Sequence, residues 1–289
     1  MTTARQLTAE FAASRIALTG LALLALVLLS AVLAPWISPQ NPYDLAALEL
    51  LDARLAPGVR SAAGHVYWLG SDDQGRDMLS AILYGLRTSV VVGLASTGFG
   101  LAIGVSIGLA AAWFGGWIEA LAMRFADLQL SFPSILIALV LLAVLGQGID
   151  KIIVALVAVQ WATYARTARA AALVERRKEY IEAAVALALP NARIIFRHLL
   201  PNCLPPLLVL GAVQVAAAIT LEATLSFLGL GLPITEPSLG LLIANGFTYL
   251  LSGHYWISLF PGIALLAAVI SINLVADRLR DVLDPRLRR

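Results

Sequence analysis

Long runs of apolar residues dominate this sequence, and shorter segments between them gather most of the charged and turn-forming residues. A helix that crosses a bilayer needs about 20 mostly apolar residues. Runs of that kind cover residues 16–37, 88–114, 121–145, 152–174, 204–232 and 256–276. The fourth run is the weakest, because Arg166 and Arg169 interrupt it before its end. The pattern predicts an all-α integral membrane protein with about six transmembrane helices.

The composition agrees with this prediction. Of 289 residues, 60% are hydrophobic and 13% are charged, whereas soluble domains have about 45–50% apolar and about 25% charged residues. The first apolar run follows two arginines, as a secretory signal does, but it is longer than the usual signal core of about 7–15 residues. Pro35 also follows Ala34, the small residue that a cleavage site would use. We therefore expect an uncleaved first transmembrane helix over 16–37.

The distribution of Lys and Arg predicts the orientation, because these residues collect in cytoplasmic loops. With the N-terminus inside, 15 of the 20 Lys and Arg residues fall in inside segments and the remaining 5 fall outside. We expect both termini in the cytoplasm, with residues 1–15 as the N-terminal tail. We also expect an extracytoplasmic loop over 38–87 and a core domain over 88–289, which includes a cytoplasmic loop over 175–202.

Few groups are available for catalysis or metal binding. Cys203 is the single cysteine, which excludes an intramolecular disulfide and a cysteine-cluster metal site. The two lysines, Lys151 and Lys178, lack the Gly-rich context of a P-loop, and the three histidines lack the spacing of metal ligands. We expect a chain that is not an enzyme and that binds no cofactor or metal. The formal net charge of +2 gives no indication of nucleic-acid binding.

One cytoplasmic segment, EYIEAAVALALPNARIIFRHLLPN (179–202), is too polar for a membrane helix. Residues recur at helical spacing on both sides of Pro190: Tyr180, Ala183, Ala184 and Leu187 before it, and Ile194, Ile195, His198 and Leu199 after it. Because Pro190 cannot continue the first helix but can open the second, we predict two short helices at an angle. The pattern alone fits two interpretations equally. The segment either docks into a groove of another protein or lies on the lipid headgroups.

This segment resembles the EAA loop of the permease subunits of ABC importers, through Glu182-Ala183-Ala184 and the stretch HLLPN at 198–202. The resemblance implies a coupling helix that docks into an ATPase subunit. The coupling residues would be Glu182, Ala183, Ala184, Leu187, Ala188, Pro190, Ile194, Ile195, His198, Pro201 and Asn202. Ala188 stands where the family pattern has glycine. If that position needs a left-handed backbone, Ala costs up to about 1–2 kcal/mol relative to Gly.

Three further stretches narrow the resemblance to the second, C-type permease subunit of dipeptide, oligopeptide and nickel importers. They are WLGSDDQGRD (68–77), SFLGLG (226–231) and NLVADRLRDVLDPR (273–286). In the first stretch Asp72 and Gly75 suit a tight turn, and we expect Arg76 and Asp77 to pair across it. This external loop would shape the outer mouth of the transport pathway. In the last stretch Asp277, Arg280 and Asp281 form either a salt-linked helix end or a solvated charged surface.

The resemblance implies the type I ABC importer transmembrane fold in a bacterial inner membrane. It also implies four partner subunits besides lipid: a second homologous permease subunit, two cytoplasmic ABC ATPase subunits and an extracytoplasmic solute-binding protein. ATP and Mg²⁺ would bind the ATPases. Di- or oligopeptides are the first expectation for the substrate, with nickel, glutathione or another small solute as alternatives.

Polar residues within the apolar runs are candidates for the transport pathway, because such residues are costly in a bilayer. Glu222 either lines a path or gate or forms a structural hydrogen bond to a neighbouring helix. Gln160, Gln214 and Asn273 either line a path between two permease subunits or hold helices together.

Two expectations concern the third run. Asp127 follows Arg124 by three residues, which favours a local ion pair. Pro133 should kink the helix. A secondary transporter driven by an ion gradient through Glu222 and Asp127 is a less favoured alternative, since the sequence shows no clear inverted repeat.

Overall fold

The computed structural model describes residues 10–44, 48–61 and 64–283, and this part of the chain is helical with two isolated β-bridges. The longer helices are α2 (Arg15–Ile37), α3 (Met78–Phe114), α4 (Gly116–Leu130), α5 (Ser134–Leu145), α6 (Ile149–Glu175), α9 (Leu200–Phe227) and α11 (Trp256–Leu283). The shorter ones are η2 (Leu50–Asp52), α7 (Glu179–Ala186), α8 (Asn191–Arg193), the π-helical η3 (Ile194–Leu199), α10 (Leu239–Phe247) and η4 (Leu250–Ser252). The predicted all-α class is confirmed. Residues 1–9 of the expected N-terminal tail and 284–286 of the C-terminal stretch lie outside the described residues.

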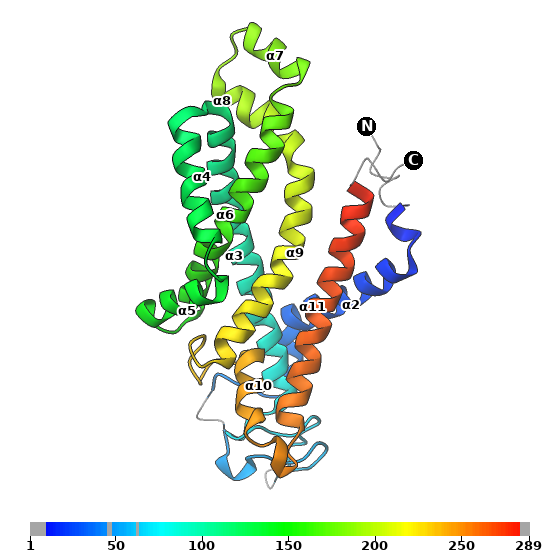
Figure 1. Ribbon diagram of the computed structural model, residues 1–289. Helices are drawn as coiled ribbons and strands as arrows, with labels where there is room; N and C mark the ends of the chain where they lie inside the picture. The colour runs from blue at the N-terminus through cyan, green and yellow to red at the C-terminus, as the bar shows by residue number, and fades with distance from the viewer. Residues whose placement is uncertain (1–9, 45–47, 62–63, 284–289) are drawn as a thin grey trace.

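The two long loops that the sequence predicts lie at opposite ends of the helical body. Figure 1 shows α7 and α8 at one end and the loop after α2 with α10 at the other. Helices α3, α6, α9 and α11 run between these ends, and α2 crosses α11 obliquely. At this crossing the backbones approach closely, because a Cβ on Gly20 would lie 2.7 Å from the Cβ of Leu274.

Four stretches are long and apolar enough to cross a membrane: Arg15–Ile37, Met78–Phe114, Asn191–Phe227 and Trp256–Leu283. The bent pair of α4 and α5 makes a fifth if it is counted as one span. Helix α6 has 27 residues but fails the same test of apolar character, since Asp150 and Lys151 lie at its start and Arg166 and Arg169 near its end. Length and composition therefore support four or five spans among the described helices rather than the expected six.

The third predicted span is broken rather than kinked. Helix α4 ends at Leu130, α5 begins at Ser134, and the two are bent by 91°. Pro133 stands immediately before α5 and has no N–H to continue the hydrogen-bond ladder of α4. The sequence thus predicts the position of the bend correctly and underestimates its size.

Helix α3 begins at Met78, earlier than the predicted start of the second span at residue 88. The Asp77 side chain accepts a hydrogen bond of 2.7 Å from the backbone N–H of Ser80, which caps the helix. The first turns are buried although they contain Ser80 and Tyr84. The expected external loop over 38–87 is therefore helical from Met78 onward.

The close packing of α3 on α6 depends on glycines spaced four residues apart, at Gly100, Gly104 and Gly108. A Cβ on Gly104 would lie 2.5 Å from the Cβ of Tyr164, and one on Gly108 would lie 2.8 Å from the Cβ of Ala168. Small residues at this spacing let helix backbones approach in a membrane. The ends of this pair of helices support the loop over 175–202.

Candidate functional site

The predicted break at Pro190 is present, and it separates α7 from a helix that continues into the membrane. Pro190 precedes α8, and α8, η3 and α9 together form the 37-residue stretch Asn191–Phe227. The second of the two expected short helices is therefore the first part of the predicted fifth span rather than a separate element.

Helix α7 presents an apolar surface to its surroundings. Tyr180, Val185 and Leu187 are exposed, Leu187 by 74%, and Phe196 on η3 is 66% exposed. Of the predicted stripe, Ala183 is also exposed, whereas Ala184 turns inward. Glu182 and Ala188 are exposed, as are Pro190, Pro201 and Asn202, and His198 is half-buried. An exposed apolar surface of this kind, on the short elements at one end of the body (Figure 1), suits contact with another protein.

The residues beneath this surface attach the loop to the body. Ile181, Ile194 and Leu199 are almost fully buried, and they pack with the ends of α3 and α6. Ile194 and Ile195, two of the expected coupling residues, therefore do not lie on an open surface. Their burial holds α7 in place instead.

Ala188 adopts the left-handed backbone conformation, with φ of +53°. Its N–H donates to the carbonyl of Val185 at 2.9 Å, and the N–H of Leu189 donates to the carbonyl of Ala184 at 3.2 Å. The turn that ends α7 is thus formed with alanine where the family pattern has glycine. The alanine carries a local conformational strain.

Arg176 ties the loop to the end of α3. Its guanidinium donates to the carbonyl oxygen of Ala112 at 2.8 Å and lies 5.4 Å from the ring centre of Trp113. Nearby, the Tyr180 hydroxyl donates to the Glu175 carboxylate at 2.7 Å. Burial and this carboxylate raise the pKa of Tyr180 above its ordinary value. The tyrosine therefore stays neutral and keeps its hydrogen bond at physiological pH.

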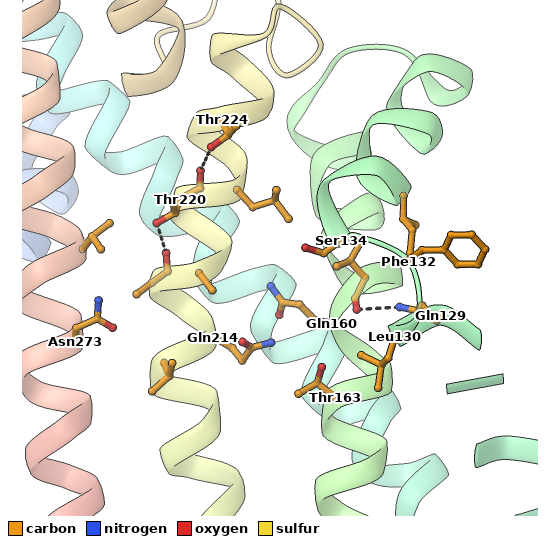
Figure 2. A pocket seen from close by; sticks show the side chains of 17 residues that line it. Gln129, Leu130, Phe132, Ser134, Gln160, Thr163, Gln214, Thr220, Thr224 and Asn273 are labelled. Atoms are coloured by element: carbon orange, nitrogen blue, oxygen red, sulfur yellow. Dashed lines mark hydrogen bonds between the residues drawn. The ribbon is translucent and has the colours of Figure 1, made fainter. Parts of the chain in front are cut away.

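A groove of about 680 Å³ opens between α6, α9 and α11 beside the break between α4 and α5. Figure 2 shows side chains from these elements converging on it. Gln160, Gln214 and Asn273 all line the groove, as the sequence predicts for a polar path. Sequence reasoning missed Gln129, whose side-chain amide donates to the carbonyls of Ala158 and Val159 and so fixes the end of α4 on α6.

Glu222 lies outside the groove. It is fully buried, and its carboxylate accepts hydrogen bonds from Ser89 at 3.0 Å, Ser226 at 2.8 Å and Ser238 at 2.8 Å. These serines belong to α3, α9 and the residue before α10. The arrangement matches the structural alternative for Glu222, in which the carboxylate joins neighbouring helices.

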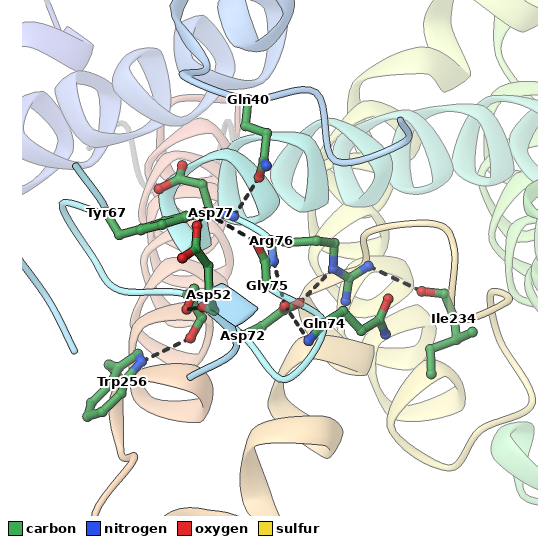
Figure 3. A network of polar contacts seen from close by, with 11 residues as sticks. Gln40, Asp52, Tyr67, Asp72, Gln74, Gly75, Arg76, Asp77, Ile234 and Trp256 are labelled. Atoms are coloured by element: carbon green, nitrogen blue, oxygen red, sulfur yellow. Dashed lines mark hydrogen bonds and ion pairs between the residues drawn. The ribbon is translucent and has the colours of Figure 1, made fainter. Parts of the chain in front are cut away.

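The external stretch 68–77 forms a buried polar network (Figure 3). The tight turn is present, with Gly75 at φ +78°. Arg76 pairs with Asp72, because the Arg76 Nε donates to the Asp72 Oδ2 at 2.6 Å. The Arg76 guanidinium also donates to the Ile234 carbonyl at 3.2 Å. The expected pair of Arg76 with Asp77 is therefore wrong, because Asp77 caps α3 instead.

Asp72, Arg76 and Asp77 have no exposed surface. The backbone N–H of Asp77 donates to the Gln40 side chain at 2.7 Å, and the Trp256 indole donates to the Ser71 carbonyl at 3.1 Å. Burial raises the pKa of the Asp77 carboxyl, although its bonds from Ser80 oppose the shift. These contacts tie the loop to the outer ends of α3 and α11. The charged residues thus stabilise the loop from within.

Two expected ion pairs form with other partners. Asp127 pairs with Arg166 on α6 rather than with Arg124. At the C-terminal end of α11, Asp281 lies 4.0 Å from Arg278 rather than from Arg280. Within the described residues no group of three or more His, Cys, Asp or Glu side chains is placed to hold a metal ion.

Comparison with known proteins identifies similarity over most of the chain. Residues 100–289 match the family described as the binding-protein-dependent transport system inner membrane component. Residues 4–57 match the N-terminal transmembrane domain of oligopeptide transport permease C.

Several curated relatives have similar length. A Brucella suis protein described provisionally as a peptide transport system permease is 43% identical over 90% of this chain and 84% of its own. The dipeptide transport system permease protein DppC of Escherichia coli K12 is 38% identical over 100% of this chain and 95% of its own. The di/tripeptide permease DppC of Pseudomonas aeruginosa is 34% identical over 98% and 92% of the two chains.

Among solved structures, a chain of the inward-facing MetNI methionine ABC transporter is similar with a TM-score of 0.57 and 22% sequence identity. The match covers 71% of this chain and 97% of that chain. At this identity the likeness shows the fold, which is that of a type I ABC importer permease.

Proposed function

Because this chain belongs to the family of inner membrane components of binding-protein-dependent transport systems, we propose that it forms half of the translocation pathway of a bacterial ABC importer for di- and oligopeptides. The peptide substrate is supported by the curated relatives, which are described as peptide, dipeptide or di/tripeptide permeases. The groove with Gln160, Gln214 and Asn273 would be this chain's share of the pathway.

The proposed assembly contains a second homologous permease subunit, two cytoplasmic ATPase subunits and an extracytoplasmic solute-binding protein. The second permease would complete the pathway opposite α9 and α11, and lipid would cover the exposed apolar sides of helices such as α2. ATP and Mg²⁺ would bind the ATPases, and this chain would supply no catalytic group and no cofactor site.

The exposed apolar face of α7 is the observation on which the coupling role depends. Leu187 and Val185 point away from the body, while Ile181 and Ile194 below them are packed into it. An ATPase that grips the exposed face would therefore move the ends of α3 and α6, because the buried side chains transmit the displacement. Burying one leucine in such an interface is worth about 1.5–3 kcal/mol.

Replacement of Leu187 tests this role. We expect Leu187→Asp to lower peptide uptake at least tenfold while ATP hydrolysis loses its stimulation by the loaded binding protein. The measurement is uptake and ATP hydrolysis by the complete complex in proteoliposomes. Leu251→Asp is the matched control, since Leu251 is fully exposed in η4 at the opposite end. Normal uptake with Leu187→Asp would remove the coupling role.

A second measurement separates the importer from an ion-coupled secondary transporter. We expect ATPase subunits to co-purify with the tagged chain and uptake to require ATP. Uptake driven by an ion gradient, with this chain alone in the membrane, would support the alternative.

A further inference from the structure

The groove between α6, α9 and α11 is polar but carries no charge. None of the 17 residues that line it is Asp, Glu, Lys, Arg or His. Its polar side chains are amides and hydroxyls, and the remainder are apolar. The carboxylate of Glu222, for which the sequence left open a place in the pathway, is enclosed by serines elsewhere. Any cargo that enters this groove therefore meets no fixed charge of either sign.

Three of the lining amide side chains have no hydrogen-bond partner among the described residues. In the described part of the chain the side chains of Gln160, Gln214 and Asn273 make no hydrogen bond to another residue. The Gln160 oxygen is buried without a partner. By contrast, the Gln129 amide and the Thr220 and Thr224 hydroxyls already donate to backbone carbonyls. A free amide offers two N–H donors and one oxygen acceptor.

From this arrangement we propose that the groove recognises the peptide backbone of the cargo through Gln160, Gln214 and Asn273, and that it does not discriminate between acidic, neutral and basic cargo side chains. This inference rests on the proposed function and deepens it. The three amides present the same donor and acceptor groups as the peptide bond, so they can replace water around a peptide backbone whatever its sequence.

The chemistry of the groove also disfavours a bare metal ion as cargo. Transition-metal ions such as Ni²⁺ are bound by imidazole, thiolate or carboxylate ligands, and the groove has none of these. A fixed charge would also bind peptides of the opposite sign and slow their release. Its absence suits a pathway that passes peptides of many sequences.

The test places a charge in the groove after the complex has assembled. Cys203 is the only native cysteine and is buried, so Gln214→Cys supplies one accessible thiol in this chain. Purified complexes in proteoliposomes are treated with a negatively or a positively charged methanethiosulfonate. Uptake of three tripeptides, with an acidic, neutral or basic central residue, is measured at saturating binding protein. The complex with the unchanged chain receives the same reagents as a control for thiols in other subunits.

We expect the unmodified Gln214→Cys complex to import the three peptides at similar maximal rates. The negative adduct should lower the uptake of the acidic peptide relative to the basic one about tenfold, which corresponds to about 1.4 kcal/mol, and the positive adduct should reverse this order. The proposal is overturned if the thiol is inaccessible, if both adducts affect all peptides equally, or if the unmodified complex already selects by charge. Asn273→Cys on α11 repeats the test if Gln214→Cys does not assemble. Absence of ATP-driven uptake of every peptide by the unchanged complex would instead refute the proposed function itself.

Discussion

At Ala188 the backbone holds a left-handed conformation that alanine resists and glycine adopts freely. We therefore predict that Ala188→Gly raises the free energy of unfolding by about 1 kcal/mol. Ala183→Gly is the matched control, because Ala183 lies within α7 and glycine there should lower stability by about 0.5–1 kcal/mol. Thermal unfolding of the purified chain in detergent measures both changes. A loss of stability at residue 188 would contradict the assignment of strain.

The three serines that donate hydrogen bonds to Glu222 lead to a second prediction. Glu222→Ala leaves the hydroxyls of Ser89, Ser226 and Ser238 without their acceptor, and an unpaired buried polar group costs about 1–3 kcal/mol. We expect a loss of stability of about 2–4 kcal/mol by thermal unfolding. Glu222→Gln retains one acceptor oxygen and should lose less. Unchanged stability together with altered transport would instead support the alternative in which Glu222 lines the transport pathway.

Asp73, in the external loop, makes stability depend on pH. Burial, and then the negative charge of Asp72, raise the pKa of the Asp73 carboxyl above its ordinary value near 4. The folded state therefore favours the protonated form, so this contribution to stability is largest at acidic pH and declines as the pH rises through the raised pKa. We expect Asp73→Asn to raise the melting temperature at pH 7 more than at pH 4. Asp277→Asn, on the exposed end of α11, is the control.

At the scale of elements, the contact between α3 and α6 has no room for a methyl group at Gly104. A Cβ there would lie 2.5 Å from the Cβ of Tyr164 and closer still to the Trp161 carbonyl. We predict that Gly104→Ala destabilises the fold by about 1–3 kcal/mol, as overpacking does. Gly98→Ala on the same helix is the control, because a Cβ at Gly98 meets nothing within 4 Å. Equal melting temperatures for the two variants would show that α3 and α6 can move apart without a loss of stability.

Much of the fold could be predicted from the sequence because a long run of apolar residues indicates a membrane helix directly. The bend at Pro133 and the break at Pro190 could be predicted because proline lacks a backbone N–H and so interrupts a helix whatever its neighbours are. The early start of α3 could not be predicted, since Ser80 is buried by a loop whose folding depends on distant partners such as Trp256. The size of the bend after α4 is likewise set by contacts with α6, among them the bonds of Gln129.

Part of the candidate site could be predicted, namely the polar side chains that are rare in membrane helices and therefore noticeable in the sequence. Gln160, Gln214 and Asn273 are amides in apolar runs, and all three meet at the groove. The partners of charged residues were not predictable, because the sequence lists neighbours along the chain and not across it. Asp127 therefore pairs with Arg166 of α6 rather than with its neighbour Arg124. Arg76 has several carboxylates near it along the chain, and the geometry of the turn decides that it pairs with Asp72.

At the scale of the whole molecule, the two ends of the helical body should face opposite compartments. We predict that, in cells expressing this chain without the ATPase subunits that would cover Leu187, a membrane-impermeant thiol reagent labels Leu251→Cys in intact spheroplasts. It should label Leu187→Cys only after the membrane is opened. Both leucines are strongly exposed, and buried Cys203 contributes no background from this chain. Labelling is read by the mass shift of the purified chain. Labelling of Leu187→Cys in sealed spheroplasts would invert the predicted orientation.

The packing of α2 on α11 at Gly20 and Leu274 has a consequence for biogenesis. These helices are separated by nearly the whole chain, so the ribosome completes the second long after the first has entered the bilayer. During translation one flank of α2 must rest against lipid, and it is covered only when the last span is inserted. A polypeptide released before that point would keep the packing of α2 on α3 but would leave the flank of α2 at Gly20 exposed to lipid.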